Sequence, residues 1–161
     1  MKTCFFIGHR DAPEGIFHLL TEAVERHISE YGVETFVVGN YGSFDRMAAR
    51  AVGMAKQDRP EIKLLLLLPY YDPLKKPGIP SCFDGSLYPE GMEKVPKRAA
   101  IVRVNQYMVR HCDFLIAIDR GQTGNTREIL RMARTREAEG LLRIENLADR
   151  WDGSGLDCSK S

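Results

Sequence analysis

Short apolar segments alternate with longer amphipathic ones along the whole chain. Five stretches are almost continuously apolar, at residues 3–7, 34–38, 62–68, 114–118 and 141–144. Such stretches are typical of strands buried on both faces of a sheet. Between them apolar residues recur at three- and four-residue spacing, as Phe17, Leu20, Val24 and Ile28 do. This second pattern predicts amphipathic helices.

The regular exchange of strands and helices predicts the fold class. We expect an α/β fold, a Rossmann-like three-layer sandwich with a mainly parallel sheet of about five strands and helices on both faces. The length of 161 residues suits one domain with one sizeable core. We place this domain at residues 1–148 and expect the small, polar residues 149–161 to form a loose C-terminal tail.

One long stretch, residues 69–97, breaks the alternation. It holds the prolines and aromatic residues Pro69, Pro73, Pro77, Pro80, Pro89, Pro96, Tyr70, Tyr71, Phe83 and Tyr88. Prolines at this density exclude a regular element, and loops of this length in compact domains are usually functional or disordered. The interleaved aromatic residues favour a packed Pro/Tyr-rich lid loop over a linker.

Composition and charge exclude several classes of function. The formal net charge is +1, so neither nucleic acid nor an anionic membrane is an expected partner. The apolar run at residues 64–68 is far shorter than the roughly 20 residues that span a bilayer, and no export signal opens the sequence, which favours a cytoplasmic location. The four cysteines form no CxxC pair and lie near no histidine at ligand spacing, so we expect free thiols and no metal site.

Candidate binding residues follow three of the predicted strands. The first loop holds Gly8, His9 and Arg10; the second holds Gly39, Asn40, Tyr41, Gly42, Ser43 and Asp45; the third holds Gly121, Gly124, Asn125 and Thr126. In an open parallel sheet, ligands bind beyond the carboxyl ends of the strands, where glycines let the backbone approach and helix N-termini attract phosphate. The sequence therefore predicts a nucleotide-type ligand. The GxGxxG and GxxxxGK[ST] fingerprints are both absent, which disfavours a standard dinucleotide site and a P-loop.

Individual side chains leave alternatives open. Arg10 either binds a phosphate or carboxylate in bidentate fashion or pairs with a loop acid such as Asp11 or Asp45. Ser43 or Asp45 can cap the helix that follows, which for Asp45 competes with a ligand contact. Glu128 favours the helix dipole in its first turn, and it is also placed to act as a general base.

Several of these motifs resemble one known family. Gly8-His9-Arg10, the segment from Gly39 to Asp45, and the run from Tyr88 to Ile101 followed by Asn105 are similar to the YpsA-like branch of the SLOG superfamily. That superfamily includes relatives of the DNA-processing protein DprA and the LOG phosphoribohydrolases. The resemblance covers about residues 1–145.

The resemblance implies a Rossmann-like domain that binds or senses a nucleotide or nucleotide derivative, of the NAD/ADP-ribose or nucleoside phosphate class. A first alternative is a LOG-like hydrolase that cleaves the N-glycosidic bond of a nucleoside monophosphate, with Glu128 as catalytic acid, assisted by Arg98 or by Arg10. This sequence departs from the LOG signature, with Asn125 in place of Thr and with Arg120-Gly121-Gln122 in place of Pro-Gly-Gly. A second alternative is DprA-like binding of single-stranded DNA. No further cofactor is expected, and LOG-like relatives suggest a homodimer.

Overall fold

The computed structural model describes residues 2–8, 10–39, 42–70, 82–119 and 125–151, and only these are discussed below. Its strands are β1 (Lys2–Ile7), β2 (Val33–Val38), β3 (Lys63–Leu67), β4 (Gly85–Leu87), β5 (Phe114–Ala117) and β6 (Arg143–Asn146). Its α-helices are α1 (Phe17–Ser29), α2 (Ser43–Asp58), α3 (Lys97–His111) and α4 (Asn125–Ala138). Short 3₁₀ helices are η1 (Glu14–Ile16), η2 (Met92–Lys94) and η3 (Leu147–Asp149).

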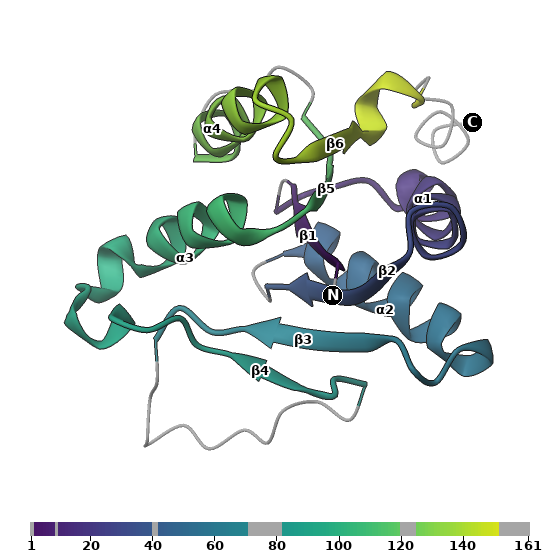
Figure 1. The fold of residues 1–161 in the computed structure, drawn as a ribbon, viewed down its shortest axis with the longest axis horizontal. Helices are drawn as coiled ribbons and strands as arrows, with labels where there is room; N and C mark the ends of the chain where they lie inside the picture. Colours follow the sequence, from purple (N-terminus) through teal and green to yellow (C-terminus); the bar gives the residue numbers. More distant parts are fainter. Residues whose placement is uncertain (1, 9, 40–41, 71–81, 120–124, 152–161) are drawn as a thin grey trace.

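The strands form a single sheet in the order β4-β3-β2-β1-β5-β6, and every neighbouring pair is parallel (Figure 1). The chain adds β2, β3 and β4 on one side of β1, and then α3 carries it back to place β5 on the other side. The strand order therefore reverses between β1 and β5. The predicted Rossmann-like α/β class is confirmed, and the sheet has six strands where about five were expected.

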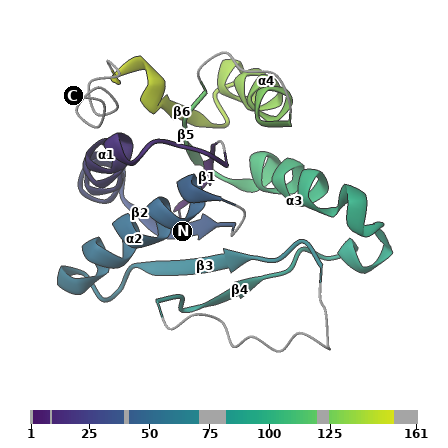
Figure 2. The ribbon, with the colours of Figure 1, turned by 180° about the vertical axis from the view of Figure 1, so that it is seen from behind.

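The sheet separates two apolar layers. In β1 the side chains of Cys4 and Phe6 join the cluster formed with α1 and α2, while Phe5 and Ile7 join the cluster formed with α3 and α4. Figures 1 and 2 show α1 and α2 on one side of the sheet and α3 and α4 on the other. Because both faces of the central strands are covered, β1 and β2 are apolar at consecutive positions, Cys4 to Ile7 and Phe36 to Val38, rather than at alternate ones.

The sixth strand lies inside the stretch that was expected to hold no regular element, and that expectation is wrong there. Between Pro80 and Pro89 the chain has enough proline-free length for β4, which pairs only with β3 at the edge of the sheet. The backbone N–H of Asp84 donates to the carbonyl of Leu64 at 2.8 Å, and the Asp84 carboxylate accepts from the Leu64 N–H and pairs with Lys56. Residues 71–81, the middle of the predicted lid, lie outside the described residues.

The C-terminal part also differs in detail from the expectation. β6 begins and ends two residues later than predicted, because its edge position tolerates the polar residues Glu145 and Asn146. Trp151, in the segment predicted as a tail, packs against the α1–α2 side of the core. Within the described residues, no helix is long and apolar enough to cross a membrane.

Candidate functional site

A cavity of about 320 Å³ lies at the carboxyl end of β1, where the strand order reverses. Its walls come from the end of β1, the loops after β1 and β2, and the first turns of α2, α3 and α4. The lining residues are Phe5, Phe6, Ile7, Gly8, Arg10, Gly39, Gly42, Asp45, Arg98, Ile101, Val102, Asn105 and Thr126. This is the position at which open parallel sheets bind their ligands.

Most of the predicted site residues that the structure describes line this one cavity. They are Gly8, Arg10, Gly39, Gly42, Asp45, Arg98, Asn105 and Thr126. Five others, His9, Asn40, Tyr41, Gly121 and Gly124, lie outside the described residues. Asn125 is the first residue of α4. Ser43 and Glu128 have different surroundings, described below.

Gly8 and Gly42 owe their identity to contacts within the protein. A Cβ on Gly8 would lie 2.5 Å from two ring atoms of Phe44 and 2.9 Å from Ile118. A Cβ on Gly42 would lie 2.5 Å from the Cα of Arg10. The two glycines thus let the end of β1 and the Arg10 loop pack directly against the start of α2, which shapes one wall of the cavity.

Ser43 strengthens the same contact between loops. Its hydroxyl lies 2.9 Å from the carbonyl oxygens of both Arg10 and Ala12, and its N–H donates to the Arg10 carbonyl at 2.8 Å. The N-cap residue of α2 is Gly42, so the hydroxyl of Ser43 holds the Arg10 loop in place instead of capping the helix. Asp45 lies in the first turn of α2, where a carboxylate is favourable to the helix dipole.

The polar lining suits an anion that also carries hydroxyl groups. Arg10 and Arg98 contribute two guanidinium groups, and Asp45 contributes the single carboxylate among the described residues that line the cavity. Asn105 adds an amide that can both donate and accept. Thr126 Oγ1 lies 3.5 Å from the carbonyl oxygen of Gly8, which sets the start of α4 against the end of β1.

The two residues predicted to be catalytic line different cavities. Arg98 lines the cavity at β1, whereas Glu128 lines a second cavity of about 320 Å³ between α3 and α4. Glu128 accepts a hydrogen bond from Arg131 at 3.2 Å, and both side chains are about two-thirds exposed. Val102 lines both cavities, so the two cavities are adjacent along α3.

Sequence reasoning missed the apolar side of the cavity, and it also missed a hydrogen-bonded pair at the end of β5. Ile101 and Val102 lie one turn from Arg98 and one turn from Asn105, a helical spacing that could have identified them. At the β5 edge, the amide of Asn146 accepts from the N–H of Asp119 at 3.0 Å and donates to its carbonyl at 3.2 Å. This pair ties the exit of β5 to the end of β6.

The buried cysteines take no part in the site. Burial raises the pKa of the Cys112 thiol to about 12 and raises the pKa of the Cys4 thiol well above its ordinary value. Both thiols are therefore protonated and weakly reactive at neutral pH. Within the described part of the chain, no group of three or more His, Cys, Asp or Glu side chains could hold a metal ion.

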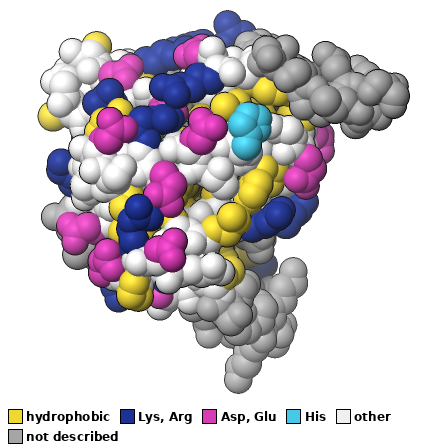
Figure 3. Space-filling view, turned by 90° about the vertical axis from the view of Figure 1, so that its right-hand side faces the viewer, with side chains coloured by type: hydrophobic (Ala, Val, Ile, Leu, Met, Phe, Trp, Pro, Cys, Tyr) yellow, Lys and Arg dark blue, Asp and Glu magenta, His cyan; other side chains and the backbone are white. Residues whose placement is uncertain are grey.

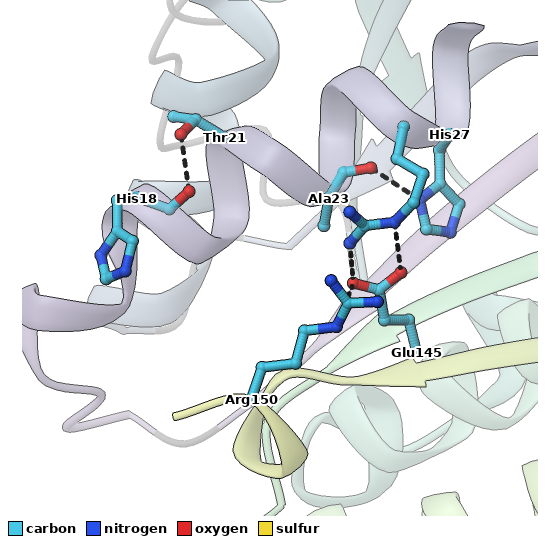
Figure 4. Close-up of polar contacts among 7 residues, drawn as sticks. His18, Thr21, Ala23, His27, Glu145 and Arg150 are labelled. Carbon is cyan, nitrogen blue, oxygen red and sulfur yellow. Dashed lines mark hydrogen bonds and ion pairs between the residues drawn. The ribbon is translucent and has the colours of Figure 1, made fainter. Parts of the chain in front are cut away.

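A separate polar cluster lies between α1 and β6 (Figure 4). Arg26 forms a bidentate ion pair with Glu145, and Arg150 approaches the same carboxylate to 4.0 Å. His27 is buried, with Nδ1 2.7 Å from the carbonyl oxygen of Ala23. Its ring contacts Tyr31 and Phe114 edge-on. This burial lowers the pKa of His27.

We compared the chain with models of known protein families and with curated proteins. No family model matches the chain. No curated protein matches it either.

Proposed function

We propose that the cavity at β1 binds the phosphate-bearing part of a nucleotide or nucleotide derivative, of the NAD/ADP-ribose or nucleoside phosphate class. The observation that carries the proposal is the composition of this cavity, in which Arg10 and Arg98 outnumber the single carboxylate of Asp45. The position at the strand-order reversal and the resemblance to YpsA-like SLOG proteins support the same class of ligand.

Each polar group has a role that its chemistry suits. A guanidinium matches the geometry of a phosphate and can donate two parallel hydrogen bonds to it. Asp45 can accept hydrogen bonds from ribose hydroxyls, and Asn105 can serve a hydroxyl or a phosphate oxygen. The first amide groups of α4 add positive electrostatic potential at Thr126.

Binding or sensing has more support than hydrolysis of an N-glycosidic bond. A catalytic acid must reach the bond that it cleaves, directly or through one water molecule. Glu128 is not among the residues that line the cavity at β1, and its carboxylate pairs with Arg131 in the α3–α4 cavity. Binding of single-stranded DNA has less support, since the formal net charge is only +1 and acidic side chains lie among the basic ones on the face shown in Figure 3.

Calorimetric titration tests the proposal. Ribose 5-phosphate, AMP, NAD and ADP-ribose are titrated into the wild type and into the Arg10→Ala, Arg98→Ala and Arg110→Ala variants. Arg110 is an exposed residue of α3 outside the cavity and serves as the matched control. We expect at least one ligand to bind, and each cavity variant to weaken it by tenfold or more, as for the loss of a charge-assisted hydrogen bond of roughly 1.5–3 kcal/mol.

Two results would overturn the proposal. The first is no binding of any of these compounds at millimolar concentration. The second is equal affinity in the Arg98→Ala, Arg10→Ala and Arg110→Ala variants. Chromatography of AMP incubated with the wild type and with Glu128→Ala separates binding from hydrolysis. We expect no release of adenine that depends on Glu128.

A further inference from the structure

A third cavity, of about 540 Å³, runs along α2 and meets the proposed site. Gly39 and Asp45 line both cavities, so the two are adjacent at the carboxyl end of β2. The other residues that line this α2 groove are Arg46, Ala49, Arg50, Gly53, Met54, Gln57, Cys82 and Phe83. A ligand held at Arg10 and Arg98 can therefore extend past Asp45 into the α2 groove.

The outward side of α2 forms one wall of the groove and the segment before β4 forms the other. The buried positions of α2, such as Phe44, Ala48 and Val52, face the core, and the groove follows the opposite side of the helix. Phe83 supplies an aromatic ring on the facing wall. Arg50 is held against α1, with its guanidinium carbon 4.3 Å from the centroid of the Phe17 ring.

Gly53 is the residue that the fold itself does not explain. Glycine disfavours the interior of a helix relative to alanine, and a helix keeps one where close packing requires it. At Gly53, among the described residues, no atom outside the neighbouring backbone of α2 lies within 4 Å of the place that a Cβ would occupy, unlike at Gly8 and Gly42. The missing side chain leaves the groove open beside Ala49, at the cost of a weaker helix.

From these observations we infer that the α2 groove binds the base of the same ligand whose phosphate occupies the cavity at β1. This inference rests on the proposed function and narrows its ligand to nucleoside phosphates that span both cavities. An aromatic base gains from apolar and aromatic walls such as Met54 and Phe83 and stacks on guanidinium planes such as that of Arg46. Gln57 offers an amide to the polar edge of the base.

Titration of a matched pair of ligands tests the inference. Ribose 5-phosphate reaches only the first cavity, whereas AMP and GMP carry a base as well. Because stacking on one base is worth about 1–3 kcal/mol, we expect at least one of the two nucleotides to bind about tenfold more tightly than ribose 5-phosphate. Gly53→Leu should fill the groove and abolish this advantage while leaving ribose 5-phosphate unaffected.

Two further variants exclude a loss of folding as the cause. Gly53→Ala should raise the melting temperature by about 2–4 °C, since alanine is the better helix former and nothing obstructs its Cβ, and should still weaken the nucleotide by several-fold. Glu22→Leu places the same leucine on the exposed side of α1, outside both cavities, and should leave all affinities unchanged.

The reactivity of Cys82 gives a readout that does not depend on affinity. Cys82 is exposed at the edge of the groove, while Cys4 and Cys112 are buried. We expect saturating AMP or GMP to slow the alkylation of Cys82 by iodoacetamide, and saturating ribose 5-phosphate to have no effect on this rate. Mass spectrometry of the peptide that contains Cys82 measures the rate.

The outcomes separate the two proposals. If ribose 5-phosphate binds and depends on Arg98, but the nucleotides bind no more tightly and ignore Gly53→Leu, the inference about the groove is overturned and the proposed function stands. If neither ribose 5-phosphate nor a nucleotide binds the wild type, the proposed function is overturned, and the inference with it.

Discussion

The contact between Gly8 and Phe44 gives a prediction that can be worked out from the structure. In Gly8→Ala, the new Cβ would lie 2.5 Å from two ring atoms of Phe44 and 2.9 Å from Cγ2 of Ile118. Ordinary van der Waals contacts begin near 3.4 Å. Phe44 is 1% exposed and Ile118 is fully buried, so neither side chain can swing into solvent to relieve the overlap.

The expected cost of this single methyl group is that of overpacking a core, about 1–3 kcal/mol of unfolding free energy. For a chain of this length, each kcal/mol lowers the melting temperature by about 2–4 °C. Urea denaturation measures the free energy directly, and the m-value should stay constant because the fold is retained. Gly85→Ala is the matched control, since a Cβ there would meet Leu65 at an ordinary 3.6 Å.

A second substitution identifies the cause. If the ring of Phe44 is what obstructs the methyl group, Phe44→Leu should relieve part of the overlap. The double variant Gly8→Ala/Phe44→Leu should then lose less unfolding free energy than the two single variants lose together. The expected difference is about 0.5–3 kcal/mol, the range for residues in contact. The reasoning is refuted if Gly8→Ala and Gly85→Ala both stay within about 0.5 kcal/mol of the wild type, the range of substitutions that disturb no packing.

Two more predictions concern the polar cluster between α1 and β6. Glu145→Gln removes the charge that holds Arg26 in a pair whose side chains are only 15% and 18% exposed, and should cost about 1.5–3 kcal/mol in urea denaturation. The control is Arg131→Gln in α4, which breaks an ion pair with Glu128 in which both side chains are about two-thirds exposed. It should cost less than about 0.5 kcal/mol. Equal losses of stability in Glu145→Gln and Arg131→Gln would contradict this account. Because burial of His27 lowers its pKa below the unfolded value of about 6.5, the unfolded state takes up a proton that the folded state resists, so stability should fall as the pH drops from 7.5 to 5.5. Denaturation at both pH values should show a smaller fall for His27→Gln than for the wild type or for the exposed control His18→Gln, and identical falls in all three would exclude His27 as the cause.

The central part of the fold could be predicted because its strands are buried on both faces. Every residue of β1 from Cys4 to Ile7 is buried in one layer or the other, and this leaves an unbroken apolar run in the sequence. β4 left no such trace, since it has three residues, lies at the edge and includes Gly85. Its place is set by hydrogen bonds to β3, which local sequence does not encode.

The candidate site also has a part that could be predicted from the sequence and a part that could not. Loops that follow parallel strands must meet at one edge, so the approach of Gly8, Gly39 and Gly42 was predictable. The position of Glu128 was not. Its neighbours Ile129 and Leu130 are buried against the sheet, and this packing fixes the rotation of α4 about its own axis. That rotation directs Glu128 toward the α3–α4 cavity.

The position of β1 at the centre of the sheet also constrains the order in which the protein can assemble during synthesis. One neighbour of β1, β2, follows within about thirty residues, but the other is β5, and Cys4 pairs with Phe114. The backbone N–H of Thr3 likewise donates its hydrogen bond to the carboxylate of Asp113, which lies 110 positions later in the chain. A nascent chain that ends before β5 can pack β1 to β3 against α1 and α2, but that layer still lacks Ile116, Ile118 and Leu147. The free side of β1 meanwhile keeps an open edge and uncovered apolar side chains. Until β5 has left the ribosome, β1 therefore keeps one edge open to pairing with other chains.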